Sequence, residues 1–299
     1  MKSYLLLTLF VSFLISAETP YVVVLGISQD GGSPQSGCNK SCCKALWGNQ
    51  NKKVSCIAIV DPISHKSWMV DATPDFPEQY QILKYKHKTE INGIFLTHAH
   101  FGHYTGLLNL GREVMGASEI PVYTMPKMKK FLINNAPWNQ LINIKNIKLI
   151  EMFEDREIQL NHHLIIEPIR VPHRDEFSET VGFKIMGEKK SLVYIPDIDK
   201  WSLWERDIIK IILNNDFILI DGTFFSNNEI PNRDMSKIPH PFITESLDLF
   251  SNLDTPNRNK IHFIHLNHTN PAIKINSAAY NLIKKKRFNI AKEGQKFNL

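Results

Sequence analysis

The chain has 299 residues, of which 43% are hydrophobic and 22% are charged, and its net charge is +5. This length and hydrophobic content allow a large folded core in one large domain or two small ones. Lysine and arginine are scattered along the chain, apart from a run at residues 284–287. Because nucleic-acid-binding proteins concentrate basic residues along one stripe, we predict no nucleic-acid partner and assign this run to a solvated helix face.

The first 17 residues have the pattern of a secretory signal peptide. A lysine at position 2 precedes an apolar run over residues 4–15, and small residues at 16 and 17 precede Glu18. This order is typical of such signals, and the apolar run is short for a membrane span. We therefore predict removal of residues 1–17, a mature domain over 18–299, and a periplasmic or secreted protein without stable membrane insertion. The alternative is a buried N-terminal helix.

Beyond this segment, strand-like and helix-like stretches follow each other along the chain. The pattern predicts strands over residues 21–25, 56–60, 67–70, 94–96, 121–123, 148–150, 164–168, 181–186, 192–195, 217–220 and 261–265. It predicts helices over 76–86, 102–117, 201–213, 243–250 and 275–285, and another that begins at Pro126. Strands interleaved with helices indicate the mixed α/β class.

The segment from Ile94 to Leu110 carries three histidines directly after a short apolar strand. His98 and His100 are two residues apart at the strand end, so their side chains point the same way. His103, on the first turn of the predicted helix, approaches from the other side. Imidazole is the commonest protein ligand for zinc and iron, so this segment predicts a metal site.

Later strands also end in residues that can bind metal. His173, Asp197, Asp221 and His265 each follow an apolar strand-like run. A single histidine or aspartate in such a place is usually a cap or a solvated loop residue. A series of them indicates one site at a common edge of the sheets.

The histidines and aspartates described above occur in an order that resembles a known family. The stretch Thr97-His-Ala-His-Phe-Gly-His103, followed in order by His173, Asp197 and His265, resembles the metallo-β-lactamase superfamily. The resemblance implies a four-layer αββα sandwich with metals at one edge between two mixed sheets. Within the superfamily, residues 29–35, 221–225 and 265–271 resemble the pyrroloquinoline quinone biosynthesis protein B group. The cysteine cluster and the His-x-x-His pattern resemble the phosphonate-pathway cyclic phosphodiesterases.

The resemblance also implies a set of site residues. Asp71 resembles a buried aspartate that orients ligand histidines. The superfamily's usual aspartate before the third histidine is Gly102 here, which implies a second metal that lacks one carboxylate and is held more weakly. We expect zinc, with one or two active-site ions, although manganese or iron would also suit. The implied ligands are His98, His100 and His173 at the first metal, a bridging Asp197, and His103 and His265 at the second.

The chain has four cysteines, at positions 38, 42, 43 and 56. Disulfides are the default in an exported protein, but the adjacent Cys42 and Cys43 are poorly placed to bridge each other. We predict a structural zinc site formed by Cys38, Cys42 and Cys43. The phosphodiesterase resemblance implies His268 as the fourth ligand. The alternative is a disulfide from Cys38 or Cys43 to Cys56.

These observations favour a hydrolase in which the metal activates water to attack an ester, phosphodiester or amide-type bond. Asp197 is a predicted catalytic residue. His240, on the long loop after Asp221, is a candidate proton donor to the leaving group or a loop residue without a role. The rival interpretations are a protein B-like oxidase, since the same ligands hold iron, and a non-catalytic binding protein. We expect a small-molecule substrate, and the sequence leaves the oligomeric state open.

Overall fold

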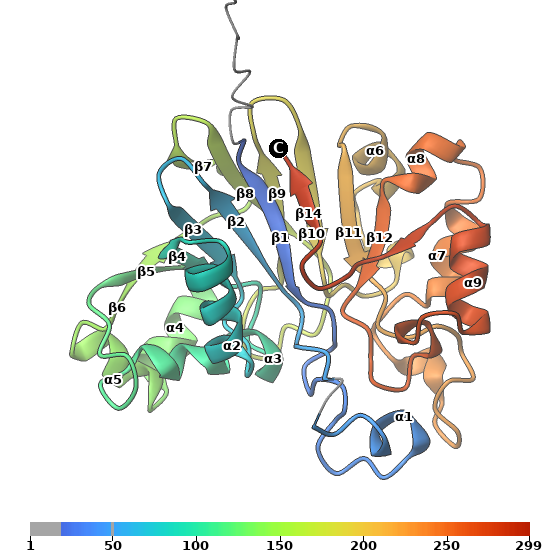
Figure 1. The fold of residues 1–299 in the computed structure, drawn as a ribbon, viewed down its shortest axis with the longest axis horizontal. Helices are drawn as coiled ribbons and strands as arrows, with labels where there is room; N and C mark the ends of the chain where they lie inside the picture. The colour runs from blue at the N-terminus through green and yellow to red at the C-terminus, as the bar shows by residue number, and fades with distance from the viewer. Residues whose placement is uncertain (1–18, 49–50) are drawn as a thin grey trace, which may run out of the picture.

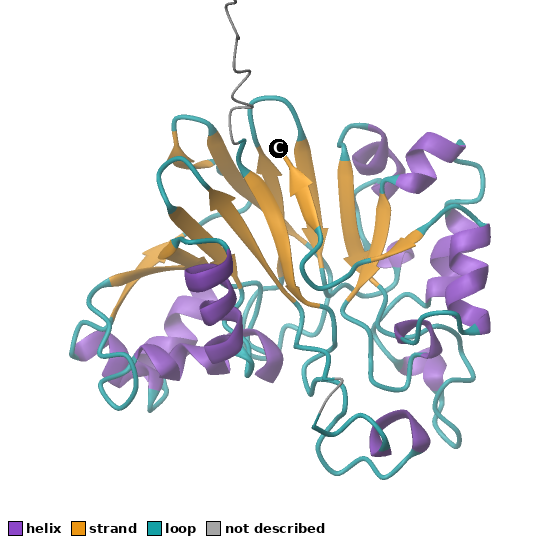
Figure 2. Ribbon diagram, in the orientation of Figure 1, coloured by secondary structure: helices purple, strands orange, loops and turns teal. Residues whose placement is uncertain are grey.

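Two seven-stranded β-sheets pack face to face, and helices cover their outer sides (Figures 1 and 2). The computed structural model describes residues 19–48 and 51–299. The predicted signal peptide lies outside this part of the chain. Within it, no helix is both long and apolar enough to cross a membrane. The predicted four-layer αββα sandwich is confirmed.

The first sheet combines the N-terminal half of the chain with its last strand. β1 (Tyr21–Gly26) pairs antiparallel with β14 (Lys296–Asn298) on one side and with β2 (Cys56–Asp61) on the other. β2 pairs antiparallel with β3 (Lys66–Val70). Three further strands continue the sheet in parallel: β4 (Glu90–Phe95), β5 (Ile120–Thr124) and β6 (Ile147–Glu151).

The second sheet is formed by the strands that follow β6. The first four pair antiparallel: β7 (Ile158–Asn161), β8 (Leu164–Arg170), β9 (Val181–Met186) and β10 (Ser191–Ile195). Three more continue parallel to β10: β11 (Phe217–Asp221), β12 (Ile261–Ile264) and β13 (Asn289–Ile290).

Each sheet has its own set of helices (Figure 1). The first sheet is covered by α2 (Phe76–Gln81) with a π-helical turn over Ile82–Lys86, α3 (Phe101–Tyr104), a 3₁₀ turn over Thr105–Leu110, α4 (Pro126–Asn134) and α5 (Trp138–Asn143). The second is covered by α6 (Ile208–Leu213), α7 (Ile243–Leu249), α8 (Thr255–Asn259) and α9 (Ala278–Lys285). Short 3₁₀ turns lie at Trp201–Leu203, Met235–Lys237 and Pro271–Ile273. The short α1 (Ser41–Lys44) stands apart at the bottom of Figure 1.

Strand β1 shows how the layers are held together. Val22 and Val24 belong to the core between the sheets, whereas Val23 and Leu25 belong to the core beneath the helices of the first sheet. All six residues of the strand are buried. A strand covered on both faces needs a continuous apolar run, which explains the β-branched sequence here.

Two predicted helices are shorter in the structure. The helix predicted over 102–117 ends at Leu110, and the chain then bends at Gly111 and again at Gly116, whose φ is 54°. The helix predicted over 201–213 is a 3₁₀ turn followed by α6. The Asp207 side chain accepts hydrogen bonds from the backbone of the first turn of α6, so it caps a new helix rather than continuing one.

The strands that precede the predicted site residues run in one direction within each sheet. In the first sheet, β1 and β3 are both antiparallel to β2, and β4 is parallel to β3. In the second, β8 and β10 are both antiparallel to β9, and β11 and β12 continue parallel to β10. Their carboxyl ends therefore deliver the following loops to the same edge of the sandwich.

Candidate metal centre

Three histidines form the first ligand group of the centre. His98 and His100 follow β4, and His173 follows β8 in the facing sheet. His98 Nε2 lies 2.8 Å from His100 Nδ1, and one ring nitrogen of each of the three lies within 4.8 Å of the others. Both sheets thus bring together the residues that the sequence predicted for the first metal.

A second group of four side chains adjoins the first. It contains His103, Asp197 and His265, which the sequence predicted, and Asp30, which it did not. His103 Nε2 lies 3.0 Å from Asp197 Oδ2 and 3.1 Å from Asp30 Oδ1. His265 Nε2 lies 3.2 Å and 3.6 Å from the same two oxygens. Because Asp197 Oδ2 is also 3.6 Å from His98 Nε2, this carboxylate stands between the two groups.

The atoms that face one another in the second group lack hydrogen bonds. Asp30 Oδ1, His103 Nε2, Asp197 Oδ2 and His265 Nε2 are buried, and none has a hydrogen-bond partner within residues 19–48 and 51–299. Buried polar atoms are almost always hydrogen-bonded, so four unpartnered atoms around one point need a cause. Two imidazole nitrogens and two carboxylate oxygens suit zinc, manganese or iron, and one divalent cation between them would satisfy all four.

Hydrogen bonds on the far side of the rings hold these histidines in place. Asp71 is fully buried, and it accepts hydrogen bonds from His103 Nδ1 at 2.7 Å and from the backbone N–H of Thr97 at 2.8 Å. Thr223 Oγ1 lies 3.0 Å from His265 Nδ1. A partner on Nδ1 fixes the ring and leaves Nε2 to face a cation. Asp71 therefore makes the contacts expected of an orienting aspartate.

The pKa values of the buried groups in the centre are shifted from their usual values. Burial alone would raise the pKa of Asp197, yet the surrounding histidines, His265 foremost, hold that pKa well below its usual range. Burial, and next the charge of His103, lowers the pKa of His98 well below its usual value. Burial also lowers the pKa of His173 to about 4. Burial opposes a charge on His103, but Asp71 first, and then Asp197 and Asp30, raise its pKa well above its usual value, so a divalent cation would have to displace a proton from this ring.

His240 and Asp221 form a pair beside the two groups. Asp221 Oδ2 accepts a hydrogen bond from His240 Nδ1 at 2.7 Å, and the backbone N–H groups of Ile198 and Thr223 donate to the same carboxylate. Burial opposes a charge on His240, but Asp221 raises the pKa of this imidazole above its ordinary value. His240 Nδ1 is 3.5 Å from Asp197 Oδ1, so the loop between β11 and α7 brings this histidine to the centre.

A cavity of about 610 Å³ opens onto these ligands. Asp30, His100, His173, Asp197 and His240 line it. Two arginines, Arg174 and Arg233, line it as well, from the loops after β8 and β11.

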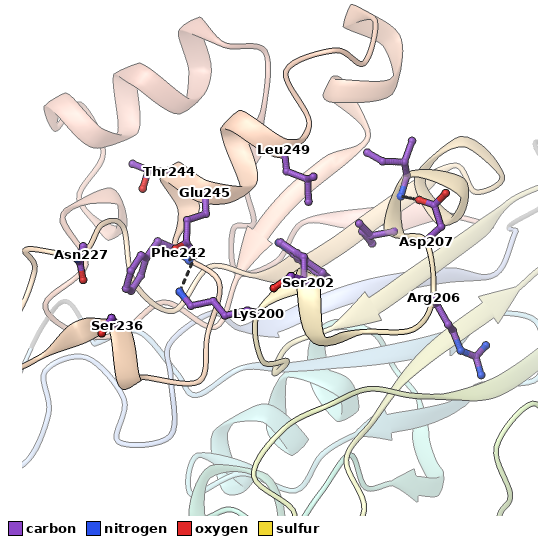
Figure 3. A pocket seen from close by; sticks show the side chains of 13 residues that line it. Lys200, Ser202, Arg206, Asp207, Asn227, Ser236, Phe242, Thr244, Glu245 and Leu249 are labelled. Atoms are coloured by element: carbon purple, nitrogen blue, oxygen red, sulfur yellow. Dashed lines mark hydrogen bonds and ion pairs between the residues drawn. The ribbon is translucent and has the colours of Figure 1, made fainter.

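A larger cavity, of about 810 Å³, lies against α6 and α7 (Figure 3). In it, Lys200 lies 2.7 Å from Glu245 and 3.7 Å from the centre of the Phe242 ring. No histidine or cysteine of the described chain lines this larger cavity. The position of the ligand groups, rather than size, therefore marks the smaller cavity as the candidate substrate site.

The cysteine cluster forms a separate site on the loop after β1, at the bottom of Figure 1. One ligand atom from each of Cys38, Cys42, Cys43 and His268 lies within 4.8 Å of the others. Burial chiefly, with the neighbouring thiols, raises the pKa of Cys43 to about 12, so its thiolate needs a cation. All four cysteines carry free thiols, and Cys56 is buried in β2. The structure thus gathers the predicted zinc ligands and shows no disulfide among the described residues.

A family model described as the Beta-lactamase superfamily domain matches residues 68–265. The chain belongs to this superfamily. The matched segment begins after the cysteine cluster and Asp30. It contains the ligands that the superfamily resemblance implied: His98, His100, His103, His173, Asp197 and His265.

Named relatives of this superfamily member cover nearly the whole chain. Coenzyme PQQ synthesis protein B of Acinetobacter baumannii (strain SDF) is 28% identical, over 93% of this chain and 100% of the relative. The protein of the same name from Methylorubrum extorquens (strain PA1) is 24% identical with the same coverage. The predicted resemblance to the protein B group is therefore confirmed.

Solved structures share the fold. Zn(2+)-bound PqqB from Methylobacterium extorquens matches with a TM-score of 0.78 at 22% identity, over 93% of this chain and 100% of that one. A diphosphatase from the PhnP family matches with a TM-score of 0.66 at 18% identity, over 94% of this chain and 98% of that one. Both likenesses support the αββα sandwich.

The structure adds one residue to the second group that the sequence did not predict. Gly102 implied a site that lacks one carboxylate, but Asp30 brings a carboxylate to the second group. The sequence did hold a signal for this residue. Asp30 lies in a glycine-rich turn that follows a buried strand. His98 and Asp197 likewise follow buried strands, each at a different place in the chain.

Proposed function

We propose that this superfamily member is a metal-dependent hydrolase that cleaves an ester, phosphodiester or amide-type bond in a small-molecule substrate. The observation that carries the proposal is the set of four buried, unpartnered ligand atoms at a cavity beside three further histidines. When bound, the metal acts as a Lewis acid and lowers the pKa of a water molecule from about 15.7 towards 7.

The chain's own residues have separate roles in this proposal. His98, His100 and His173 would hold the first cation, and His103 and His265 would face the second. Asp197 turns Oδ2 towards both groups. Its Oδ1 faces His240 instead, so this oxygen can orient an attacking water molecule by accepting a hydrogen bond from it.

His240 is placed to protonate the leaving group. Asp221 engages Nδ1, so Nε2 is the nitrogen that can exchange a proton with a molecule in the cavity. The carboxylate of Asp221 also stabilises the protonated ring. An oriented imidazole whose pKa is raised by a carboxylate partner is suited to act as a general acid.

The charge of the cavity wall favours an anionic substrate. Arg174 and Arg233 reach the same cavity from two different loops. Guanidinium groups bind phosphate and carboxylate oxygens in pairs of hydrogen bonds. Among the three bond types, this wall supports a phosphodiester, whose non-bridging oxygens carry a negative charge.

A protein B-like oxidase is the second candidate, and the relatives named Coenzyme PQQ synthesis protein B favour it. The histidine and carboxylate donors would hold iron as readily as zinc. A binding protein without catalysis is the third candidate, since the cavity alone could bind a small molecule.

Purified protein loaded separately with zinc, manganese or iron distinguishes these functions. We expect hydrolysis of bis(p-nitrophenyl) phosphate with zinc or manganese, and slower hydrolysis after Arg174→Ala or Arg233→Ala. The hydrolase proposal fails if ester, phosphodiester and anilide substrates all remain intact with each metal. Oxygen uptake that requires iron would support the oxidase.

We also propose that the protein is exported, on the basis of the sequence pattern over residues 1–17. Mass spectrometry of the protein recovered from a periplasmic fraction should give a chain that begins at Glu18. Recovery of the uncut chain from the cytoplasm alone would contradict this.

A further inference from the structure

Gly102 marks a place where the chain has no room for a side chain. A methyl group built on Gly102 would lie 2.5 Å from Asp30 Oδ1 and 2.6 Å from Asp30 Cα. Real contacts of this kind are essentially never below 3.0 Å. One of the two atoms belongs to the backbone, so a rotation of the Asp30 side chain would not relieve the clash. The space in front of Gly102 is therefore filled by Asp30 itself.

Asp30 places its carboxylate among the ligands of the second group. Oδ1 is 3.1 Å from His103 Nε2 and 3.6 Å from His265 Nε2, and it has no hydrogen-bond partner in the described chain. The Asp30 side chain is 31% exposed, but its Oδ1 is buried, and a buried carboxylate oxygen without a hydrogen bond is costly unless a cation neutralises it.

Backbone hydrogen bonds fix the position of Asp30 relative to another ligand. The N–H of Gln29 donates to the carbonyl of Leu266 at 2.9 Å, and Ser28 forms a parallel bridge to the same residue. Leu266 directly follows the ligand His265. The turn is closed by a bond of 2.7 Å from Gly32 N–H to the Gln29 carbonyl. Asp30 and His265 are thus held next to each other by the backbone.

We propose that Asp30 Oδ1 is a ligand of the second metal and supplies, from the N-terminal loop, the carboxylate that Gly102 cannot. Gly102 then leaves the space that Asp30 needs in order to reach the metal, and the centre holds two cations rather than one. The proposal rests on the metal centre of the proposed function but not on the reaction that it catalyses.

Asp30→Asn tests this with metal content as the readout. The amide keeps the shape of the side chain and removes its charge. Metal analysis of zinc-loaded, gel-filtered protein should show one equivalent fewer than the unaltered chain. Manganese titration should show binding at least about tenfold weaker at the second site, since loss of an outer-shell partner alone costs about 10–100-fold. Equal stoichiometry and affinity in both proteins would overturn the proposal.

Glu176→Gln is the matched control. Glu176 is also a carboxylate beside the centre, but its contact is 3.3 Å to His100 Nε2, the nitrogen that does not face His98. Because His100 belongs to the first ligand group, this variant should leave the metal content and manganese affinity of the second site unchanged. Equal loss in both variants would mean that general charge, not ligation, holds the metal, and would also overturn the proposal.

Gly102→Ala gives an independent test that alters no ligand. The added methyl group must displace Asp30, so this variant should lose the same equivalent of metal. If thermal melting shows that Asp30→Asn does not fold, the metal content of Gly102→Ala tests the proposal instead. If Asp30→Asn loses metal but the unaltered protein hydrolyses no substrate, Asp30 is a ligand and the hydrolase proposal fails. If Asp30→Asn keeps its metal and the unaltered protein is an active hydrolase, only the proposal that Asp30 is a ligand fails.

Discussion

The histidine–carboxylate centre and the cysteine cluster hold their ligands in different ways. In the centre, ligands follow the ends of buried strands, and partners such as Asp71 and Thr223 fix the rings from behind. In the cluster, two ligands lie on α1, which has four residues. A hydrogen bond of 3.4 Å from the backbone N–H of Gln35 to Cys43 Sγ is a weak support by comparison.

This difference separates two uses of a metal. The ligands of the centre are positioned by the fold, so the protein should keep their geometry when the metal is removed. The cluster brings thiols together that repel one another once ionised, so its geometry should depend on the ion. Metal loss at the centre should therefore remove activity, and metal loss at the cluster should remove stability.

The largest expected effect comes from His98→Ala combined with His100→Ala. Loss of two of three nitrogens should abolish the first metal and reduce hydrolysis to background, while the metal-free melting temperature changes little. Metal analysis and an activity assay measure this. His163→Ala, at an exposed site beside Glu188, is the control. Unchanged metal content at the centre in the double variant would show that these histidines are not ligands.

His240→Gln should reduce kcat with poor leaving groups by about 10²–10⁴-fold, because it removes the general acid. Metal content should stay the same, which distinguishes this residue from the ligands. The effect should shrink with p-nitrophenolate, which leaves without protonation. An equal loss for good and poor leaving groups would argue against proton donation by this histidine.

Cys42→Ser should release the cluster metal and lower the free energy of unfolding by on the order of 3 kcal/mol, as expected when a structural metal is lost. Chemical denaturation measures this, and Cys56→Ala, which changes no predicted ligand, should keep the zinc. Thiol titration of the denatured, metal-stripped chain should find four free thiols. Two would indicate a disulfide and exclude the zinc site.

The smallest effect concerns Glu229, on the loop after β11. Its carboxylate accepts hydrogen bonds from the Thr269 hydroxyl and the Phe225 N–H, and burial raises its pKa to about 7. Because the folded pKa lies above the ordinary value of 4.5, the stabilisation is complete below about pH 4.5 and is lost as the pH rises through about 7. Glu229→Gln should flatten this slope by about 1 kcal/mol per pH unit between pH 5 and 7. Urea unfolding of metal-free protein between pH 5 and 8, run on both proteins, checks this; parallel slopes would contradict it.

The buried strands and the ligands that follow them were predictable because each leaves a local pattern. An apolar run that ends in His98 or Asp197 can be seen in the sequence alone. Asp30 left a weaker pattern, since its meaning depends on a contact with Gly102, far along the chain. The two-residue β13 and the three-residue β14 are too short to show alternation. The break in the helix before Asp207 depends on a cap that periodicity does not show.

The order of the cysteine cluster along the chain has a consequence for biosynthesis. Cys38, Cys42 and Cys43 lie near the start of the chain, whereas His268 follows the late strand β12. Chains emerge from the ribosome N-terminus first, so three thiols are exposed before their fourth ligand has been made. Closure of the cluster is therefore a late event in folding. Oxidation of these thiols before His268 is made would prevent the cluster from closing.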